Sequence, residues 1–468
     1  MVELPDTSNE DYTTKRAVSY SLAGFTDVIL FQFFSFLIFT FYYSVVGLNV
    51  NLITLAFVIW SVWNAFNDPL LGGISDRTHT KWGRRKPFIV AGILPLLVIN
   101  ILLWTPPVGN DLITFAYFLA ILCLNDFFYT MYSVNQTSLF PEMFRNLDQR
   151  AKANTWVQFL QILALMIAFL LPSFFIPNYT DPKNFPNYMF AAVVISGICL
   201  ISAIAFIKYG LKERPEYAQD FENNPSFLQS FKITLKNKSF LTYVVGIFAL
   251  WYAFGMIPAI LPLYGRFVLN IDNSTILSLL LATGFISAAV FISVWRIILQ
   301  KLAAKVASII AQLSFIATLL PFMFISDVLS AFIAFIFLGF GLAGALIVRD
   351  VTIAVIIDED ELKTGVRREG AFYGVNGFVA KLTNVVIFLS ISTVFNSVGW
   401  AIFNPLGTTD QTIFGLRSLL SLFPIVLLVL GIIAMAFFPI NKAKYAELTT
   451  EAKKLHEQKS EAVKNQSL

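Results

Sequence analysis

The sequence has few charged residues for its length. Of 468 residues only 13% are charged, while 57% are hydrophobic. Soluble domains carry about 25% charged residues, because water must wet their surfaces. A chain with so little charge cannot cover soluble domains of this total size. We therefore expect a membrane protein whose surface contacts mainly lipid.

Cysteine, histidine and phosphate-binding motifs are equally scarce. The two cysteines, Cys123 and Cys199, lie in apolar runs, which excludes a disulfide framework. The two histidines, His79 and His456, are far apart and give no zinc pattern. A Gly-x4-Gly-Lys-Ser/Thr loop is missing, so ATP hydrolysis is not expected. The net charge of +4 is small and scattered between apolar runs, so it gives no reason to expect a nucleic-acid partner. We expect no enzyme, no metal site and no cofactor.

Long apolar runs are what the sequence has in abundance. A helix needs about 20 apolar residues to cross a bilayer. The first run, 28–67, must turn near 47–51 and gives two spans, and 112–141 is interrupted only by Asp126. The other runs are 88–110, 153–180, 184–207, 239–265, 273–295, 306–326, 328–348, 382–409 and 418–441, of which 328–348 continues past Asp350 and 382–409 begins near 370. The prediction is twelve transmembrane helices in an all-α protein.

The distribution of basic residues predicts the orientation. With a cytoplasmic N-terminus, 28 of the 33 Lys and Arg residues fall in inner loops and tails. This is the bias that the positive-inside rule describes. The first 17 residues have no apolar core, so no signal peptide is expected. Both termini are predicted to be cytoplasmic, in a multi-pass protein of the cell membrane.

The longest inner connection, 211–237, divides the chain into two halves. We predict a cytoplasmic segment 1–17, a six-helix bundle 18–210, the linker 211–237, a second six-helix bundle 238–441 and a cytoplasmic tail 442–468. Six plus six helices is the plan of the major facilitator fold.

A charged motif follows the second span. It reads Asn64-Ala-Phe-Asn-Asp68-Pro69-Leu-Leu-Gly72-Gly-Ile-Ser-Asp76-Arg77, with Gly83-Arg84-Arg85 further on. A second motif, Asp358-Glu-Asp-Glu-Leu-Lys-Thr-Gly-Val-Arg-Arg368-Glu369-Gly370, enters the eleventh span. Together they resemble the glycoside–pentoside–hexuronide:cation symporter family, which includes the bacterial melibiose carrier. The resemblance covers most of the chain.

The two motifs predict a cytoplasmic gate. Carboxylates at helix ends and arginines that bind them can hold an inner gate closed. The predicted gating residues are Gly72, Asp76, Arg77, Gly83, Arg84, Arg85, Asp358, Arg368 and Glu369, with Glu369 and Asp358 as partners of the first motif. The alternative is that these charges only set the topology.

Six ionisable residues lie within predicted spans: Asp27, Asp68, Asp126, Arg349, Asp350 and Lys381. Such groups cost about 2.5–3.5 kcal/mol on insertion scales and face a cavity or a partner. For Arg349 and Asp350 we expect structural ion pairs, each with a residue on another span, because adjacent positions are about 100° apart on a helix.

Asn64, Asn67 and Asp68 share one helix face and predict a cation site. In the melibiose carrier the matching stretch supplies carboxylates at the positions of both Asn64 and Asp68, and the resemblance also implies a coupling role for Lys381. Since Asp68 is then the one carboxylate at this site, proton coupling is favoured over sodium. Lys381 would pair with Asp68 or Asp126 when the site is empty.

The predicted substrate site combines two polar stripes and one acid. Alignment with the family places its sugar contacts at Ser133, Thr137 and Gln158, and its first-span acid near Asp27. None of the three helix contacts is retained, so Asp126 is expected to stand in for the acid. The eleventh span contributes Tyr373, Asn376 and Gly377, and the aromatic candidates are Trp63, Trp156, Trp251 and Tyr252.

The sequence thus predicts proton-coupled symport of a sugar or glycoside by alternating access, with lipid and a small-molecule substrate as partners and a monomeric state. Two alternatives remain open at this point. One is a lysolipid or amphiphile transporter of the same fold, and the other is a transport-inactive membrane sensor or scaffold.

Overall fold

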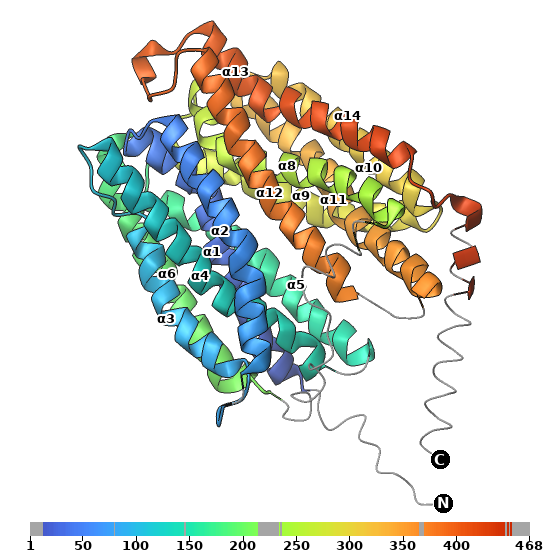
Figure 1. Cartoon of the computed structure of the whole chain (residues 1–468). Helices are drawn as coiled ribbons and strands as arrows, with labels where there is room; N and C mark the ends of the chain where they lie inside the picture. The colour runs from blue at the N-terminus through green and yellow to red at the C-terminus, as the bar shows by residue number, and fades with distance from the viewer. Residues whose placement is uncertain are drawn as a thin grey trace, which may run out of the picture. The chain divides into compact units, whose positions relative to one another are not determined.

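The computed structural model describes residues 13–78, 80–144, 147–213, 234, 236–364, 369–444, 447, 448, 450 and 451. It describes their side chains except at 69, 76, 77, 147, 148 and 369–371. The helices are labelled as in Figure 1. Most of the predicted linker 211–237 lies outside the described residues, as does Arg368.

The first compact unit holds the N-terminal helices (Figure 1). They are α1 (Thr14–Thr40, prolonged by a π-helical stretch Phe41–Val45), α2 (Val50–Arg77), α3 (Lys86–Leu102), α4 (Asp111–Met143), α5 (Leu147–Leu170) and α6 (Phe185–Ala205). The unit also includes Asp272–Ala282 and Gly399–Pro405. Helix α1 packs on α5 and α6, while α4 packs on α2 and α3.

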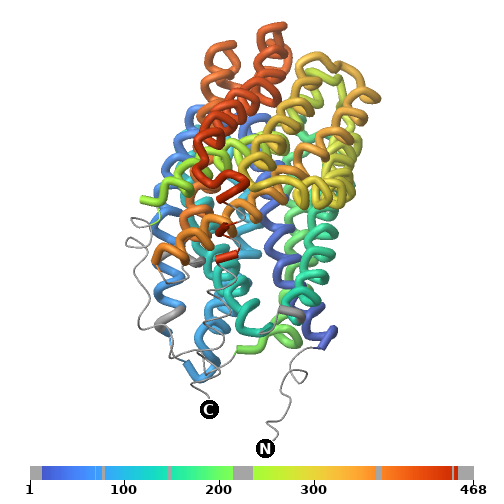
Figure 2. Tube along the Cα trace, turned by 90° about the vertical axis from the view of Figure 1, so that its right-hand side faces the viewer, coloured from blue at the N-terminus to red at the C-terminus, as the bar shows by residue number. Residues whose placement is uncertain are grey.

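The second unit holds the C-terminal helices. They are α8 (Lys238–Phe267), α9 (Ser274–Leu299) from Thr283 onward, α10 (Ala304–Leu319), α11 (Val328–Thr364), α12 (Glu369–Ser397), α13 (Asp410–Leu420) and α14 (Leu422–Ala436). Helix α8 packs on α12, α13 and α14, and α10 lies alongside α11 (Figure 2).

Lipid explains why the described chain is almost entirely helical. In hydrocarbon every backbone N–H and C=O group must be bonded within the protein, and a helix does this locally. Within the described residues, 11 helices are long and apolar enough to cross a membrane, and the 17-residue α3 is a shorter apolar helix. Helices α13 and α14 together form one of these 11 candidate spans. With α3 as the twelfth span, the predicted count of twelve is confirmed.

The predicted turns and interruptions can be compared one by one. The first apolar run breaks between Val45 and Val50, and α4 continues through Asp126, as expected. The run 382–409 was expected to form one span, but α12 ends at Ser397 and a 3-10 turn follows at Pro405–Gly407. A prediction based only on the absence of charge therefore made this helix too long, because glycine, asparagine and proline end a helix without adding charge.

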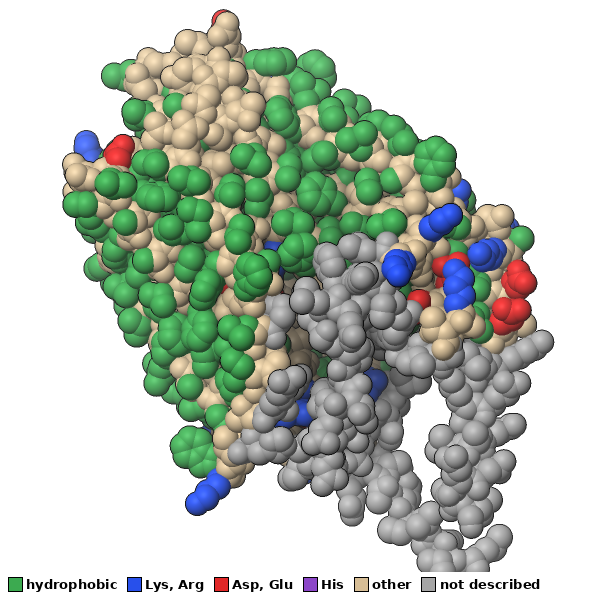
Figure 3. Space-filling model, in the orientation of Figure 1, with side chains coloured by type: hydrophobic (Ala, Val, Ile, Leu, Met, Phe, Trp, Pro, Cys, Tyr) green, Lys and Arg blue, Asp and Glu red, His purple; other side chains and the backbone are tan. Residues whose placement is uncertain are grey.

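The surface agrees with a membrane environment. Hydrophobic side chains spread over the visible face, and most of its charged side chains lie near the ends of helices (Figure 3). Exposed large residues occur on most spans, for example Phe66, Phe159 and Phe337. Exposed apolar side chains on this scale would be unfavourable in water and are expected against lipid.

Candidate functional site

A polar cluster joins α2 and α4 inside the first unit. Asn67 Nδ2 donates to Asp126 Oδ2 at 2.9 Å and to Thr130 Oγ1 at 3.2 Å, and Asn64 Nδ2 donates to Asp126 Oδ1. Thr130 Oγ1 donates to Asp68 Oδ1 at 2.8 Å. Two carboxylates from different helices are thereby connected through one hydroxyl and one amide.

Helical spacing explains why these residues meet. Asn64, Asn67 and Asp68 are spaced i, i+3 and i+4 on α2, while Asp126 and Thr130 are one turn apart on α4. The two helices pack against each other, so the two polar faces coincide. The sequence indicated the α2 half of this cluster, but it placed Asp126 with the substrate and did not include Thr130.

One acceptor in the cluster lacks a partner. The Oδ1 atom of Asn67 is buried and accepts no hydrogen bond within the described structure. A buried polar atom without a partner costs about 1–3 kcal/mol, so such an atom calls for an explanation. Carboxylate, amide and hydroxyl oxygens are the ligands that hard cations prefer. This donor set can therefore hold a small cation.

A second polar group lies between α1 and α4. The carboxylate of Asp27 on α1 lies beside the hydroxyls of Tyr129 and Ser133 on α4. Its Oδ1 atom is buried and accepts no hydrogen bond within the described part of the chain. The structure therefore brings together two of the predicted substrate residues, Asp27 and Ser133, and adds Tyr129. An acceptor flanked by hydroxyls suits a hydroxylated ligand.

The other predicted substrate residues lie apart from this group or are engaged elsewhere. Thr137 Oγ1 donates to Ser133 O at 2.8 Å, and Gln158 is exposed on α5. On α12, Asn376 accepts from Tyr243 at 3.2 Å and Tyr373 is exposed. An added Cβ at Gly377 would meet no described atom within 4 Å.

Lys381 is half-buried on α12 and belongs to the second unit. Its predicted pairing with Asp68 would join the two units and stays a prediction.

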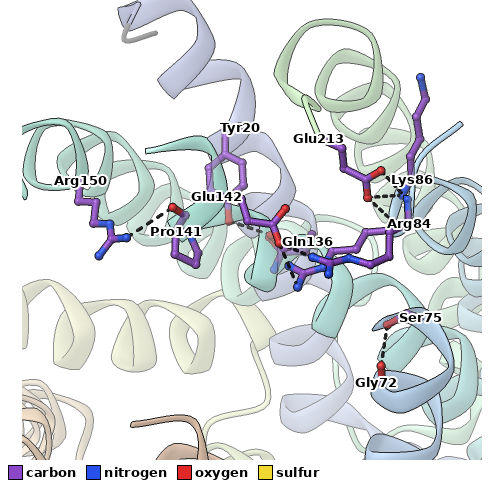
Figure 4. Close-up of polar contacts among 11 residues, drawn as sticks. Tyr20, Gly72, Ser75, Arg84, Lys86, Gln136, Pro141, Glu142, Arg150 and Glu213 are labelled. Carbon is purple, nitrogen blue, oxygen red and sulfur yellow. Dashed lines mark hydrogen bonds and ion pairs between the residues drawn. The ribbon is translucent and has the colours of Figure 1, made fainter. Parts of the chain in front are cut away.

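The basic loop at Gly83-Arg84-Arg85 is held by two acids that the sequence did not single out (Figure 4). Arg84 Nη2 and Arg85 Nη2 lie 2.7 and 3.1 Å from Glu142 Oε1. Glu213 accepts the backbone N–H groups of Arg84 at 2.7 Å, Lys86 at 3.1 Å and Arg85. A carboxylate is thus bound at the N-terminus of α3, where the helix dipole favours negative charge.

The predicted gating partners are only partly described. Side chains of Asp76, Arg77 and Glu369 lie outside the described residues, and Asp358 belongs to the second unit. Gly72 lies on α2, where its carbonyl accepts from Ser75 at 3.0 Å (Figure 4). No periodic pattern in the sequence links Glu142 or Glu213 to this loop. Glu142 lies 58 residues from Arg84, and Glu213 lies 128 residues from Arg85.

The prediction of structural ion pairing for Arg349 and Asp350 is confirmed, but the prediction that each pairs with a residue on another span was wrong. These neighbours on α11 bind each other, with Arg349 Nε–Asp350 Oδ1 at 2.8 Å and Nη2–Oδ2 at 3.1 Å. The long arginine side chain can fold back along its own helix, so the angle between the two Cβ directions does not prevent the pair. The Arg349 guanidinium also lies 5.3 Å from the ring centre of Trp251.

With this geometry in view, the chain can be compared with known proteins. Residues 18–442 match the family described as MFS/sugar transport protein. The chain belongs to this family, and it is a multi-pass membrane transporter with the major facilitator fold rather than an enzyme.

Relatives in the family differ in what they carry. The chain is 24% identical to the isoprimeverose transporter of Lactiplantibacillus pentosus, covering 91% of this chain and 88% of the relative. It is 23% identical to the glucuronide carrier protein homolog of Escherichia coli, over 95% and 96%. It is 22% identical to the sodium-dependent lysophosphatidylcholine symporter 1 of Gallus gallus, over 86% and 82%.

Solved structures agree on the fold. A nucleoside transporter aligns with a TM-score of 0.65 at 14% identity, covering 91% of this chain and 100% of that one. A D-xylose-proton symporter aligns with a TM-score of 0.63 at 12% identity, covering 90% and 97%.

Proposed function

We propose that this transporter couples the uptake of a sugar or glycoside to the inward movement of a cation. The observation that carries the proposal is the connection of Asp68 to Asp126 through Thr130 and Asn67. Intramembrane carboxylates are expensive and mark ion or substrate pathways. The predicted cation residues Asn64, Asn67 and Asp68 are retained in this proposal, and Asp126 moves from the substrate site to the cation site.

Sodium is the ion that this donor set favours. The sequence argument for a proton assumed one carboxylate, but Asp126 adds a second one. Two carboxylates, the Thr130 hydroxyl and the unpartnered Asn67 Oδ1 provide oxygen ligands for a metal cation. A proton needs only one acid, so it leaves this arrangement unexplained. Proton coupling is the alternative that the experiments below distinguish.

The substrate class follows from the group around Asp27. Its carboxylate and the hydroxyls of Tyr129 and Ser133 offer an acceptor and several donors on one surface. Sugar hydroxyls both donate and accept, so they can use all of these groups. Relatives that carry isoprimeverose and glucuronide support a glycoside substrate.

A lysolipid is the second candidate, because a lysophosphatidylcholine symporter is among the relatives. A lysolipid could satisfy the buried, unbonded Oδ1 of Asp27 only with its headgroup, since its acyl chain has no donor, whereas a sugar offers hydroxyl donors all around its ring. We therefore place the lysolipid second.

Uptake by proteoliposomes tests the proposal. Purified protein would be given isoprimeverose, a methyl glucuronide and lysophosphatidylcholine in turn, each under an inward sodium gradient at uniform pH. We expect accumulation of a glycoside that stops in Asp68→Asn and persists in Asp111→Asn, whose acid is exposed at the start of α4. Accumulation of lysophosphatidylcholine alone would favour the second candidate, and no uptake of any probe would contradict the proposal.

A further inference from the structure

A basic group lies in the first unit where α1 begins and α6 ends, away from the proposed cation and sugar residues. Helix α6 continues as a π-helical stretch, Phe206–Gly210, which carries Lys208 and Tyr209. The Nζ atom of Lys15 on α1 lies 5.8 Å from the ring centre of Tyr209, and that of Lys208 lies 5.2 Å from it. Two cations thus converge on one aromatic ring. We call Lys15, Lys208 and Tyr209 the α1/α6 basic group.

Close packing between α1 and the π-helical stretch brings these residues together. An added Cβ at Gly210 would lie 2.6 Å from the backbone of Ser19, so only glycine permits this approach. The ring of Phe206 meets that of Tyr20 edge to face at 6.1 Å. Since Phe206 and Gly210 are buried against α1, the side chains of Lys208 and Tyr209 are left exposed.

The two lysines are not neutralised by acids. Within the described residues, neither Lys15 nor Lys208 forms an ion pair with a carboxylate. Glu213, the acid that follows the π-helical stretch, accepts the backbone N–H groups of residues 84 to 86 instead. Neighbouring like charges repel each other, so an anion between the two ammonium groups would be stabilised.

The position of the group along its helices places it at the bilayer surface. The candidate spans Thr14–Val45 and Pro182–Gly210 have 32 and 29 residues, whereas about 20 cross the hydrocarbon. Lys15 is the second residue of the first span, and Lys208 lies two residues before the end of the second. Tyrosine rings at span ends lie at the level of the lipid headgroups.

An exposed apolar stripe leads along α6 to this group. Val193, Ile201 and Ile204 are exposed, and Gly197 between them is exposed with open space where a Cβ would lie. Their spacing of three and four residues puts them on one face of the helix, and Lys208 follows four residues after Ile204. The face that contacts lipid tails therefore ends in two cations.

We propose that the α1/α6 basic group binds the headgroup of an anionic phospholipid whose acyl chain lies along the α6 stripe. The ammonium groups of Lys15 and Lys208 bind the phosphate, and the Tyr209 hydroxyl donates to one of its oxygens. The stripe selects a lipid over a soluble phosphate, because only a lipid uses both the apolar and the cationic part. The positive-inside rule predicts that this end faces the cytoplasm, where basic residues near the membrane attract anionic lipids. This lipid is a bound component of the protein, distinct from the transported substrate.

Native mass spectrometry of the purified full chain tests the site with phosphatidylglycerol and phosphatidylcholine of identical acyl chains. We expect one phosphatidylglycerol per chain to be retained under conditions that remove phosphatidylcholine. The double variant Lys15→Gln, Lys208→Gln should bind phosphatidylglycerol about tenfold more weakly or less, because both cations are lost. Lys183→Gln, which neutralises an exposed lysine just before the other end of α6, is the matched control and should retain the lipid.

A charge-preserving variant separates recognition from folding. Lys15→Arg, Lys208→Arg keeps both cations and should retain phosphatidylglycerol as the unaltered protein does; its loss there would contradict recognition by charge. Equal retention of the two lipids by the unaltered protein, or undiminished retention in the glutamine variant, would overturn the site. Binding of inorganic phosphate alone, without a preference for phosphatidylglycerol, would also overturn it, since the lysines would then bind a soluble anion.

Discussion

At the scale of single residues, Asp126 decides how the cation site is understood. The sequence has an amide at position 64 where the related carrier has a carboxylate, so the pattern along α2 alone indicates one acid fewer. The structure places Asp126 of α4 against that amide. In the proposed cation site the neighbouring helix thus supplies the second acid, and a pattern along α2 alone does not record that contact.

Moving the carboxylate from position 126 to position 64 tests whether Asp126 replaces the acid that α2 lacks at position 64. We expect Asp126→Asn to reduce sodium-driven uptake at least tenfold, because one of two carboxylate ligands becomes neutral. The double variant Asn64→Asp, Asp126→Asn again has two carboxylates, now at positions 64 and 68 on one face of α2, and should recover a substantial part of the loss. The measurement is initial uptake against sodium concentration, and a double variant as inactive as Asp126→Asn would contradict the idea of exchange between these positions.

Asp68 carries a separate prediction. Neutralising it in Asp68→Asn should abolish gradient-driven accumulation while preserving exchange of substrate across the membrane, because the substrate contacts at Asp27 are untouched. Counterflow in preloaded vesicles measures exchange without any ion gradient. A variant that loses counterflow as well would show that Asp68 contributes to substrate binding or folding rather than to coupling alone.

At the scale of elements, the cap of α3 is a contact that sequence reasoning missed. Gly83 has a left-handed φ of +107°, and an added Cβ would lie 1.6 Å from Glu213 Oε2. A side chain at this position must therefore displace the carboxylate that binds the N–H groups of residues 84 to 86. Glycine here allows a carboxylate more than 100 residues away to approach the backbone.

We expect Gly83→Ala and Glu213→Gln each to lower the melting temperature by about 2–4 °C, the shift that 1 kcal/mol produces in a unit of this size. The double variant should lose less than the sum, because both changes remove the same cap. Gly109→Ala is the matched control, since Gly109 has a similar φ of +101° but open space around it. Additive losses in a thermal-shift assay would show that Glu213 and Gly83 act independently.

The elements themselves were largely predictable from the sequence. Hydrophobic length alone located the spans, including α4 through Asp126 and α11 through Arg349, because lipid permits only helices of that length. Helix ends were predicted less well. In α12 the charge-free run continues past the glycine and asparagine residues that follow the end of the helix, so charge alone could not locate that end. Contacts between helices, such as Thr130 with Asp68 or Glu142 with Arg84, depend on packing that a period along one helix does not record.

At the scale of the whole molecule, the chain is a transporter in which each half carries an intramembrane charged group. The first unit holds the Asp68–Asp126 cluster and the Asp27 group, and the second holds the Arg349–Asp350 ion pair. In the proposed mechanism a cation at Asp68 and Asp126 and a sugar at Asp27 are coupled because each alters the affinity of the protein for the other. The identity of the cation is therefore the central claim.

Binding of ²²Na⁺ to the purified protein tests that claim most directly, because it needs neither a known substrate nor transport. We predict saturable binding of one sodium ion per chain at neutral pH, lost in Asp68→Asn and Asp126→Asn and unchanged in Asp111→Asn. Absence of saturable sodium binding in the unaltered protein, together with glycoside accumulation driven by a pH gradient in sodium-free vesicles, would contradict it.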